Sequence, residues 1–267
     1  MIKIIFCDMD GTLLTSENKL PEGFDEMMGE LKRRGVIFAP ASGRQFFSLV
    51  RSFERYRDEF LFAAENGTLV MYKGEEIFSS PIGFDAARKI LAASDGFDNI
   101  LRVWCGKKDA YILREQNLPM FRDELEKYYT HNSFTDSFDA IDDMPVKVSF
   151  FDATGHADKN IYDKLAPFHD SLQIVLASAH WVDVMSPDVN KGVAVKNVQR
   201  AMNLKPEECA AFGDYLNDAE MFQAVEYSFA MGNAHPDAKK FAKFETTDND
   251  HAGVLVGIRQ LIACGLI

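Results

Sequence analysis

The chain has 267 residues, enough for one large domain or two of moderate size, and its 47% hydrophobic and 26% charged residues are ordinary for a globular protein. The net charge of −12 argues against sequence-independent binding of nucleic acid, because no surplus of lysine and arginine is present to displace counterions from phosphates. An acidic protein that handles an anionic phosphate needs a metal ion or a few well-placed cations to overcome its own field.

Cysteine usage and hydropathy predict a cytoplasmic protein that has no membrane partner, and the net charge predicts no nucleic-acid partner. The expected state is a monomer or small homo-oligomer, between which the sequence does not choose. The four cysteines form no C-x-x-C pair, and Cys7 and Cys209 lie in apolar runs typical of buried free thiols. Too few residues precede the first charge for a signal peptide. No run of about 18 apolar residues occurs, so no transmembrane helix is expected.

Strand and helix patterns alternate over roughly the first 80 residues. Nearly all-apolar segments at 2–7, 36–41 and 60–64 predict parallel strands that are buried on both faces. Apolar residues at helical spacing over 24–31 predict an amphipathic helix that ends before Gly35. This alternation is typical of an α/β sheet.

From about residue 81 the pattern changes, and neither glycine-rich turns nor clustered carboxylates occur. Helices are predicted at 84–93, 118–129 and 157–168, and strands at 100–105, 110–113, 146–151, 172–177 and 181–185. This order predicts an α+β layer, one open sheet with helices on one face. We interpret residues 81–186 as an inserted cap domain that confers substrate specificity.

After Pro187 the alternation returns. The predicted elements are a helix from Lys191-Gly192 to about 202, a strand at 209–212, a helix at 217–225 and a strand at 227–231. The predicted fold class is therefore α/β, with a Rossmann-like parallel-sheet core of residues 1–80 and 187–267 and the α+β cap inserted between them.

Two carboxylates follow the first predicted strand, Asp8 and Asp10, just before Gly11. Side chains two apart on an extended backbone project to the same side, so the two negative charges lie close together. Such a pair is costly unless a cation neutralises it. The segment therefore predicts a Mg²⁺ site with a carboxylate positioned to attack a substrate.

Polar groups also follow other predicted strands or open a helix: Ser42-Gly43-Arg44, Glu65-Asn66-Gly67, Lys191, and Gly213-Asp214 with Asn217-Asp218. In open α/β sheets ligands bind at the carboxyl ends of the strands. A carboxylate can accept a phosphoryl group, a hydroxyl and backbone N–H groups can hold phosphate oxygens, and a lysine can offset their charge. Further carboxylates suit Mg²⁺, which prefers oxygen ligands.

Four segments closely resemble the four motifs of haloacid dehalogenase-like (HAD) phosphatases. They are Asp8-x-Asp10-Gly11-Thr12, Ala41-Ser42-Gly43-Arg44, Asn190-Lys191-Gly192 and Gly213-Asp214-x-x-Asn217-Asp218. The resemblance is closest to the Cof-type subgroup with a C2-type (C2B-like) cap. The insertion lies between the second and third motifs, where that subgroup places its cap.

The resemblance implies catalytic roles for Asp8, Asp10, Ser42 and Lys191. Asp8 corresponds to the nucleophile, and Asp10 to the general acid for the leaving alcohol and then the base for water. Ser42 and the Gly43 backbone correspond to the motif that holds phosphate. Lys191 corresponds to the cation that offsets the charge of Asp8 and the phosphoryl group.

The resemblance also implies the metal and substrate contacts. The expected Mg²⁺ group is Asp8, Asp10 (through its main-chain carbonyl), Asp214 as principal ligand, and Asp218 in support through water. The substrate contacts that it implies are Gly43 and Asn217. Arg44 and Asn66 are also expected to contact substrate, because they follow strand ends that face the same edge of the sheet. No residue of the four motifs is missing.

These features predict a phosphoric monoester hydrolase, a Mg²⁺-dependent phosphatase that forms an aspartyl-phosphate intermediate. Its expected substrates are small phosphorylated metabolites, and sugar phosphates are the favoured class among them. Two alternatives stay open. A phosphotransferase or phosphomutase acting on sugar phosphates would use the same intermediate but return the phosphoryl group to an alcohol. A non-catalytic sensor would bind a phosphorylated ligand without turnover.

Overall fold

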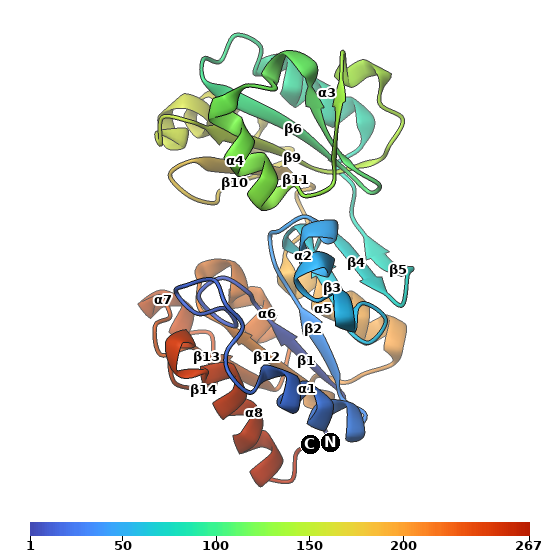
Figure 1. Ribbon diagram of the computed structural model, residues 1–267, viewed down its shortest axis with the longest axis vertical. Coiled ribbons are helices and arrows are strands. Elements are labelled where there is room, and N and C mark those ends of the chain that lie inside the picture. Colours follow the sequence, from blue (N-terminus) through green and yellow to red (C-terminus); the bar gives the residue numbers. More distant parts are fainter. The chain divides into compact units, whose positions relative to one another are not determined.

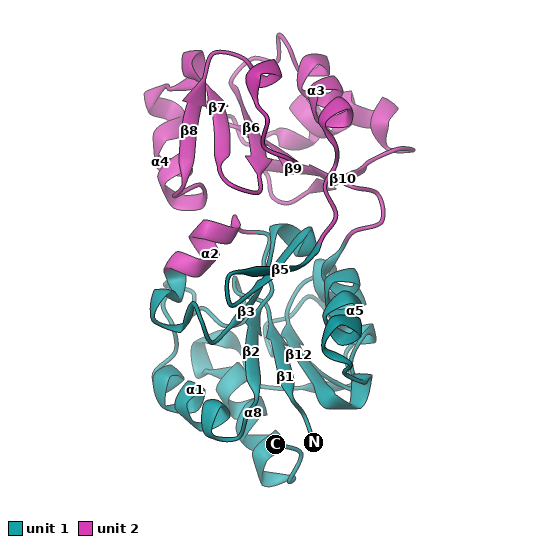
Figure 2. Ribbon diagram, turned by 90° about the vertical axis from the view of Figure 1, so that its right-hand side faces the viewer, with its two compact units in different colours: residues 1–43, 52–78, 190–267 teal, residues 44–51, 79–189 magenta.

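The computed structural model describes residues 1–267, and the chain divides into two compact units (Figure 2). Unit 1 comprises residues 1–43, 52–78 and 190–267, and unit 2 comprises residues 44–51 and 79–189. The short segment 44–51, which contains most of helix α2 (Phe46–Ser52), belongs to unit 2, whereas the sequence analysis assigned it to the core. No helix combines the length and apolar character that a bilayer crossing requires.

Unit 1 is built on a parallel five-stranded sheet of order β14-β13-β12-β1-β2 (Figure 1). Its strands are β1 (Ile4–Cys7), β2 (Ile37–Pro40), β12 (Cys209–Gly213), β13 (Tyr227–Ala230) and β14 (Phe244–Glu245). In the centre, Ile4 of β1 pairs with Ile37 on one side and Cys209 on the other. All of β1 and β12 is buried, which explains their nearly continuous apolar sequences.

A second, three-stranded sheet, of order β3-β4-β5, continues from this one. Its strands are β3 (Leu61–Ala64), β4 (Leu69–Tyr72) and β5 (Glu75–Ser79), with β3 and β4 antiparallel. A parallel bridge between Ala41 and Ala63 connects it to the end of β2. The carboxyl ends of β1, β2 and β3 therefore lie along one edge.

Helices cover both faces of the unit 1 sheet. They are α1 (Phe24–Arg33), α5 (Lys191–Met202), α6 (Ala219–Gln223), α7 (Pro236–Lys239) and α8 (Gly253–Ala263). Helices α5 and α6 pack on the face that carries Ile4 and Phe6. On the other face Phe24 of α1 contacts the Phe38 ring, and α8 approaches the Phe212 ring through Gly257. The predicted α/β fold class with a Rossmann-like core is confirmed.

Unit 2 contains a six-stranded sheet of order β10-β11-β9-β6-β7-β8, antiparallel except for the parallel pair β7–β8. Its strands are β6 (Ile100–Gly106), β7 (Ala110–Leu113), β8 (Asn132–Thr135), β9 (Pro145–Asp152), β10 (Gln173–Leu176) and β11 (Trp181–Met185). Its α-helices, besides α2, are α3 (Phe84–Ala93) and α4 (Pro119–Tyr128). Strand β8 was not predicted.

The two longer helices of unit 2 pack on opposite faces of its sheet. Helix α3 shares one buried cluster with Trp104 and Phe150. On the other side, Phe121 of α4 meets the Phe151 ring edge-on at 6.2 Å between centroids. Since successive strand residues point to opposite faces, Phe150 and Phe151 face different helices. The expectation of helices on one face only is therefore wrong.

The predicted α-helix at 157–168 is a π-helix (Asp158–Tyr162) followed by a 3-10 helix (Asp163–Phe168). Pro167 lies inside the second segment and has no N–H to donate, so a regular α-helical ladder cannot continue through it. Ile161 and Leu165 are nevertheless buried against the sheet. The apolar spacing was interpreted correctly, but the type of helix was not.

Asp152, at the end of β9, organises the turn that precedes this irregular helix. Its fully buried carboxylate accepts hydrogen bonds from the N–H and hydroxyl of Thr154, both at 2.7 Å, and from Nδ2 of Asn160 at 2.8 Å. It also accepts one from the His156 N–H at 3.2 Å. Burial alone would raise the pKa of Asp152, but these hydrogen bonds outweigh burial and lower the pKa below its ordinary value.

We expect Asp152→Asn to lower the free energy of unfolding of unit 2 by about 1–3 kcal/mol, because an NH₂ group replaces an oxygen that faces donors. The lowered folded-state pKa means that the stabilisation is present above the unfolded pKa of about 3.9 and is lost as pH falls through the folded pKa. Urea titrations from pH 7 to pH 3.5, followed by tryptophan fluorescence, test this, since Trp104 and Trp181 both lie in unit 2. Exposed Asp170→Asn is the control, and an equal loss at all pH values would contradict the assignment.

Candidate active site

The turn after β1 carries the first two predicted acids. Asp8 continues the sheet, with its N–H donating to the Phe212 carbonyl at 3.0 Å. Gly11 has a φ of +81°, and a Cβ there would lie 2.5 Å from Oδ2 of Asp214. The hydroxyl of Thr12 donates to the other Asp214 oxygen at 2.7 Å. The Gly-Thr pair therefore allows the turn to close onto Asp214.

Lys191 begins helix α5, whose N-cap is Asn190; the Asn190 side chain accepts from the Val193 N–H at 2.9 Å. The Lys191 side chain is 1% exposed, and its Nζ donates to Asp8 Oδ1 at 2.5 Å and to Asp218 Oδ1 at 2.6 Å. A buried ammonium is costly unless it is paired with carboxylates and hydrogen-bonded to them. The two carboxylates meet that requirement and fix the position of Nζ beside Asp8.

Asp218 is fully buried and uses both of its oxygens. Oδ1 contacts Lys191, while Oδ2 accepts from the N–H groups of Asp214 at 3.0 Å and Tyr215 at 3.1 Å. A Cβ at Gly213 would lie 2.5 Å from Oδ2, so only glycine lets the loop close around this carboxylate. Asp218 thus orients both Lys191 and the Asp214 loop.

Three carboxylates, Asp8, Asp214 and Asp218, have oxygens within 4.8 Å of one another. Such an all-oxygen group suits Mg²⁺, because a divalent cation would offset the negative charge of three neighbouring carboxylates. The Asp10 carboxylate is exposed and is not part of this group, and the contribution of its main-chain carbonyl to a metal site stays a prediction. The side-chain hydrogen bonds of Asp218 favour a supporting role.

Burial and the repulsion between carboxylates raise the pKa values of Asp8 and Asp214. Burial raises the pKa of Asp8 well above its ordinary value; the Lys191 ammonium opposes this, while Asp218 and Asp214 add to it. Burial also raises the pKa of Asp214, and the Thr12 hydrogen bond opposes it. Burial alone would lower the pKa of Lys191, but Asp218 and Asp8 outweigh it and raise the pKa, so the ammonium persists at neutral pH.

Ser42 and Gly43, which are predicted to hold phosphate, and Asn66, a predicted substrate contact, come together at the ends of β2 and β3. Ser42 is buried, its N–H donates to the Ala63 carbonyl at 2.9 Å, and its own carbonyl accepts from the Asn66 N–H at 3.0 Å. A Cβ at Gly43 would lie 3.0 Å from Oδ1 of Asn66. Asn66 has a left-handed φ of 56°, which asparagine tolerates better than most residues.

Two predicted substrate contacts are less well defined. Asn217 is exposed on the loop between Asp214 and Asp218. Arg44 is the first residue of unit 2, and its participation in the site stays a prediction.

Sequence reasoning missed the roles of two side chains in this region. The contact from Thr12 to Asp214 was not foreseen, although Thr12 lies in a motif. The Asn233 amide donates to the Gly11 carbonyl at 2.8 Å from 222 positions away. The only signal in the sequence is that Asn233 lies two residues beyond the predicted strand at 227–231.

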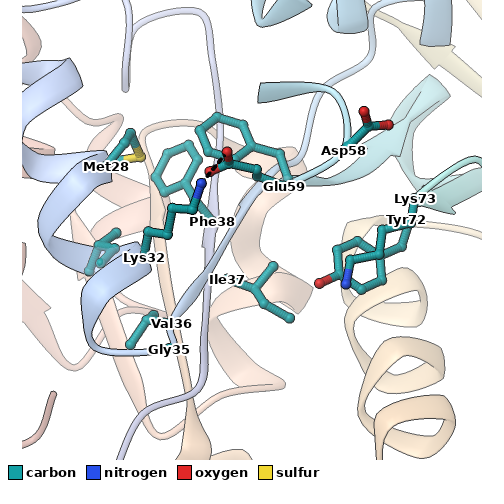
Figure 3. A pocket seen from close by; sticks show the side chains of 12 residues that line it. Met28, Lys32, Gly35, Val36, Ile37, Phe38, Asp58, Glu59, Tyr72 and Lys73 are labelled. Atoms are coloured by element: carbon teal, nitrogen blue, oxygen red, sulfur yellow. Dashed lines mark hydrogen bonds and ion pairs between the residues drawn. The ribbon is translucent and has the colours of Figure 1, made fainter. Parts of the chain in front are cut away.

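A separate cavity of about 390 Å³ lies in unit 1 near the end of α1 and the start of β2 (Figure 3). Phe38 and Ile37 line it, and an ion pair of 2.6 Å joins Lys32 to Glu59 beside it. These residues lie at the amino end of β2, the edge of the sheet opposite to Asp8. The cavity is therefore not part of the predicted active site.

Comparison with known proteins identifies the family. Residues 5–258 match the model of the family of haloacid dehalogenase-like hydrolases. The chain is 30% identical, over 98% of its length and 96% of the relative's, to 5-amino-6-(5-phospho-D-ribitylamino)uracil phosphatase YbjI of Escherichia coli (strain K12). It is 26% identical to phosphatase YwpJ of Bacillus subtilis (strain 168), over 98% of this chain and 100% of that protein.

Solved structures share the fold. The crystal structure of SMU.1108c from Streptococcus mutans UA159 has a TM-score of 0.84 at 24% identity, covering 98% of this chain and 100% of that one. The HAD subclass IIB sugar phosphatase BT4131 has a TM-score of 0.80 at 22% identity, covering 99% and 100%. At these identities the likeness concerns the fold.

The chain belongs to the haloacid dehalogenase-like hydrolases. Within that family it is a Cof-type phosphatase, so the predicted class of enzyme, a phosphoric monoester hydrolase, is confirmed.

Proposed function

We propose that this protein is a Mg²⁺-dependent phosphatase that hydrolyses small phosphorylated metabolites through an aspartyl-phosphate intermediate. Sugar phosphates are the substrate class that we favour. The observation that carries the proposal is the contact of Lys191 with Asp8 at 2.5 Å, beside the Asp214 carboxylate. YbjI of Escherichia coli is by name a phosphatase of a phosphorylated ribityl compound, and the structural neighbour BT4131 is by name a sugar phosphatase. Both names favour a phosphorylated polyol or sugar.

In the proposed first step an Asp8 oxygen bonds to phosphorus as the ester P–O bond breaks, and Asp10 gives its proton to the departing alcohol oxygen. In the second step Asp10 takes a proton from water, which attacks the phosphorus of the aspartyl-phosphate and releases inorganic phosphate and the Asp8 carboxylate. Lys191 opposes the effect of burial on the pKa of Asp8 and so favours its ionised form, and Ser42 with the Gly43 N–H holds phosphate oxygens. Mg²⁺, held by Asp8, Asp214 and the Asp10 carbonyl, would supply positive charge to the phosphoryl oxygens.

We further propose that residues 1–80 and 187–267 form the catalytic core and residues 81–186 the domain that selects the substrate. Arg44, Asn66 and Asn217 are the proposed substrate contacts. The proposed setting is the cytoplasm, and the proposed state is a monomer or small homo-oligomer.

A panel of phosphorylated metabolites, assayed for phosphate release with Mg²⁺ and no added alcohol acceptor, tests the proposal. We expect turnover that EDTA abolishes and added Mg²⁺ restores. Turnover that persists after EDTA would contradict the metal requirement. Release of the substrate alcohol only when an acceptor alcohol is added, with the phosphoryl group recovered on that acceptor and no free phosphate formed, would instead favour a phosphotransferase.

A further inference from the structure

The loop of residues 231–235 lies between β13 and α7, which Figure 1 labels, and its hydrogen bonds bridge two of the motif turns in unit 1. Its Met231 N–H donates to the Gly213 carbonyl at 3.0 Å, and its His235 N–H donates to the Asp214 carbonyl at 2.8 Å. Its Asn233 side chain reaches the other turn and donates to the Gly11 carbonyl at 2.8 Å. The loop therefore connects the Asp214 turn to the turn that carries Asp10.

A second loop holds Asn233 and supports the same segment. The Asn233 side-chain oxygen accepts from the Asn249 N–H at 3.2 Å, so both ends of this amide are bound. The Asn249 side chain donates to the Leu14 carbonyl at 2.9 Å, and Asp250 accepts from the Ser16 N–H at 2.8 Å. The chain from Gly11 to Ser16 is thus tethered at three points by side chains from distant loops.

The Gly11 tether acts next to Asp10. The Gly11 carbonyl belongs to the peptide one residue beyond Asp10, and Gly11 has a positive φ, which glycine adopts without strain because it lacks a Cβ. The Asp10 carboxylate is exposed and lies outside the buried carboxylate group. The backbone of this turn fixes the position of the Asp10 Cα and the direction of its Cα–Cβ bond.

We propose that Asn233 is a positioning residue that, by holding the Gly11 carbonyl, aims the Asp10 carboxyl at the leaving-group oxygen. This inference rests on the proposed function, in which Asp10 is the general acid. A misplaced general acid slows the step in which the leaving group departs, and it does so most when that group is a strong base. A purely structural role for Asn233 would affect all esters alike.

Phenyl phosphate and p-nitrophenyl phosphate separate these two roles, because they differ little in shape but much in leaving-group basicity. Phenol has a pKa of about 10, as in tyrosine, whereas p-nitrophenol is a far stronger acid and needs little protonation. The quantity to measure is kcat/KM in Mg²⁺, which reports the steps up to release of the alcohol.

For Asn233→Ala we expect kcat/KM for phenyl phosphate to fall on the order of tenfold or more, and that for p-nitrophenyl phosphate to fall less than about threefold. Asn233→Asp, which keeps the acceptor for Asn249 but sets an oxygen against the Gly11 carbonyl, is expected to show the same selectivity. Asn117→Ala, an exposed asparagine of unit 2, is the matched control and should change neither value.

An equal fall for both esters, or no fall in either Asn233 variant, would overturn the inference while leaving the proposed function intact. Absence of turnover of both esters by the wild-type protein in Mg²⁺ would overturn the proposed function and the inference with it. The thermal unfolding midpoint of each variant, which a positioning role leaves unchanged because Asn233 is exposed, separates the selective effect from a loss of fold.

Discussion

Asp8→Asn is expected to lower kcat for a phosphomonoester by on the order of ten-thousandfold or more, since removal of a covalent nucleophile leaves only binding and electrostatic stabilisation. The substitution is nearly isosteric, so the turn after β1 keeps its shape. Lys191 keeps Asp218 as a partner at 2.6 Å and does not become an unpaired buried cation. The loss should therefore appear in kcat with little change in the unfolding midpoint.

Acid quenching during turnover of a ³²P-labelled ester provides a second measurement. Wild-type protein should retain covalent label that hydroxylamine releases, as an acyl phosphate does, and Asp8→Asn should retain none. Asp170→Asn, an exposed carboxylate of unit 2, is the control for the loss of one negative charge. Turnover of Asp8→Asn within tenfold of wild type would refute the nucleophile assignment.

Strands β1, β2, β12 and β13 of the unit 1 sheet could be predicted because each is marked by its own apolar composition, whereas the edge strand β14, two exposed residues, was not predicted. The sequence of β1 is apolar throughout since both of its faces and both of its edges are covered. Helix α5 begins where its local sequence indicates, because Asn190 caps it. Such signals are local and need no knowledge of the rest of the chain.

Elements that depend on distant partners could not be predicted in the same way. Strand β8, Asn132–Thr135, has one apolar residue in four and is a strand because the edge of β7 offers hydrogen-bond partners to it. Helix α8 was not predicted at all. Gly257 lowers intrinsic helix propensity, yet it is needed because a Cβ there would lie 2.4 Å from the Phe212 ring.

The same distinction applies to the site. Asp8, Lys191 and Asp214 were predicted together because strand ends of a parallel sheet meet at one edge, and the sequence motifs marked them. The tether from Asn233 to Gly11 carries no such mark, since an exposed asparagine in a turn is common and its partner lies 222 positions away. The local sequence therefore indicates the charged groups of this edge better than it indicates the side chains that tether its loops.

Lys191→Met is expected to have the largest effect on stability, lowering the free energy of unfolding of unit 1 by about 3–5 kcal/mol in the absence of Mg²⁺. Lys191 is 1% exposed, and its removal leaves the fully buried Asp218 carboxylate and the Asp8 carboxylate without their cation. Hydrogen exchange of peptides that cover β1 and β12 measures this loss, because the central strands of the sheet exchange through the most complete openings. Turnover should be lost as well.

Two further variants show that the uncompensated carboxylates cause the loss. Lys196→Met makes the same substitution at an exposed position of the same helix and should cost little. The double variant Lys191→Met with Asp218→Asn should be more stable than Lys191→Met alone, because it removes one of the two stranded charges; the coupling is read from a double-mutant cycle. If the losses of the two single variants simply add, the ion pair between Lys191 and Asp218 does not stabilise the site. The stability of the turn from Asp214 to Asp218 must then come from the hydrogen bonds that Asp218 accepts from the N–H groups of Asp214 and Tyr215.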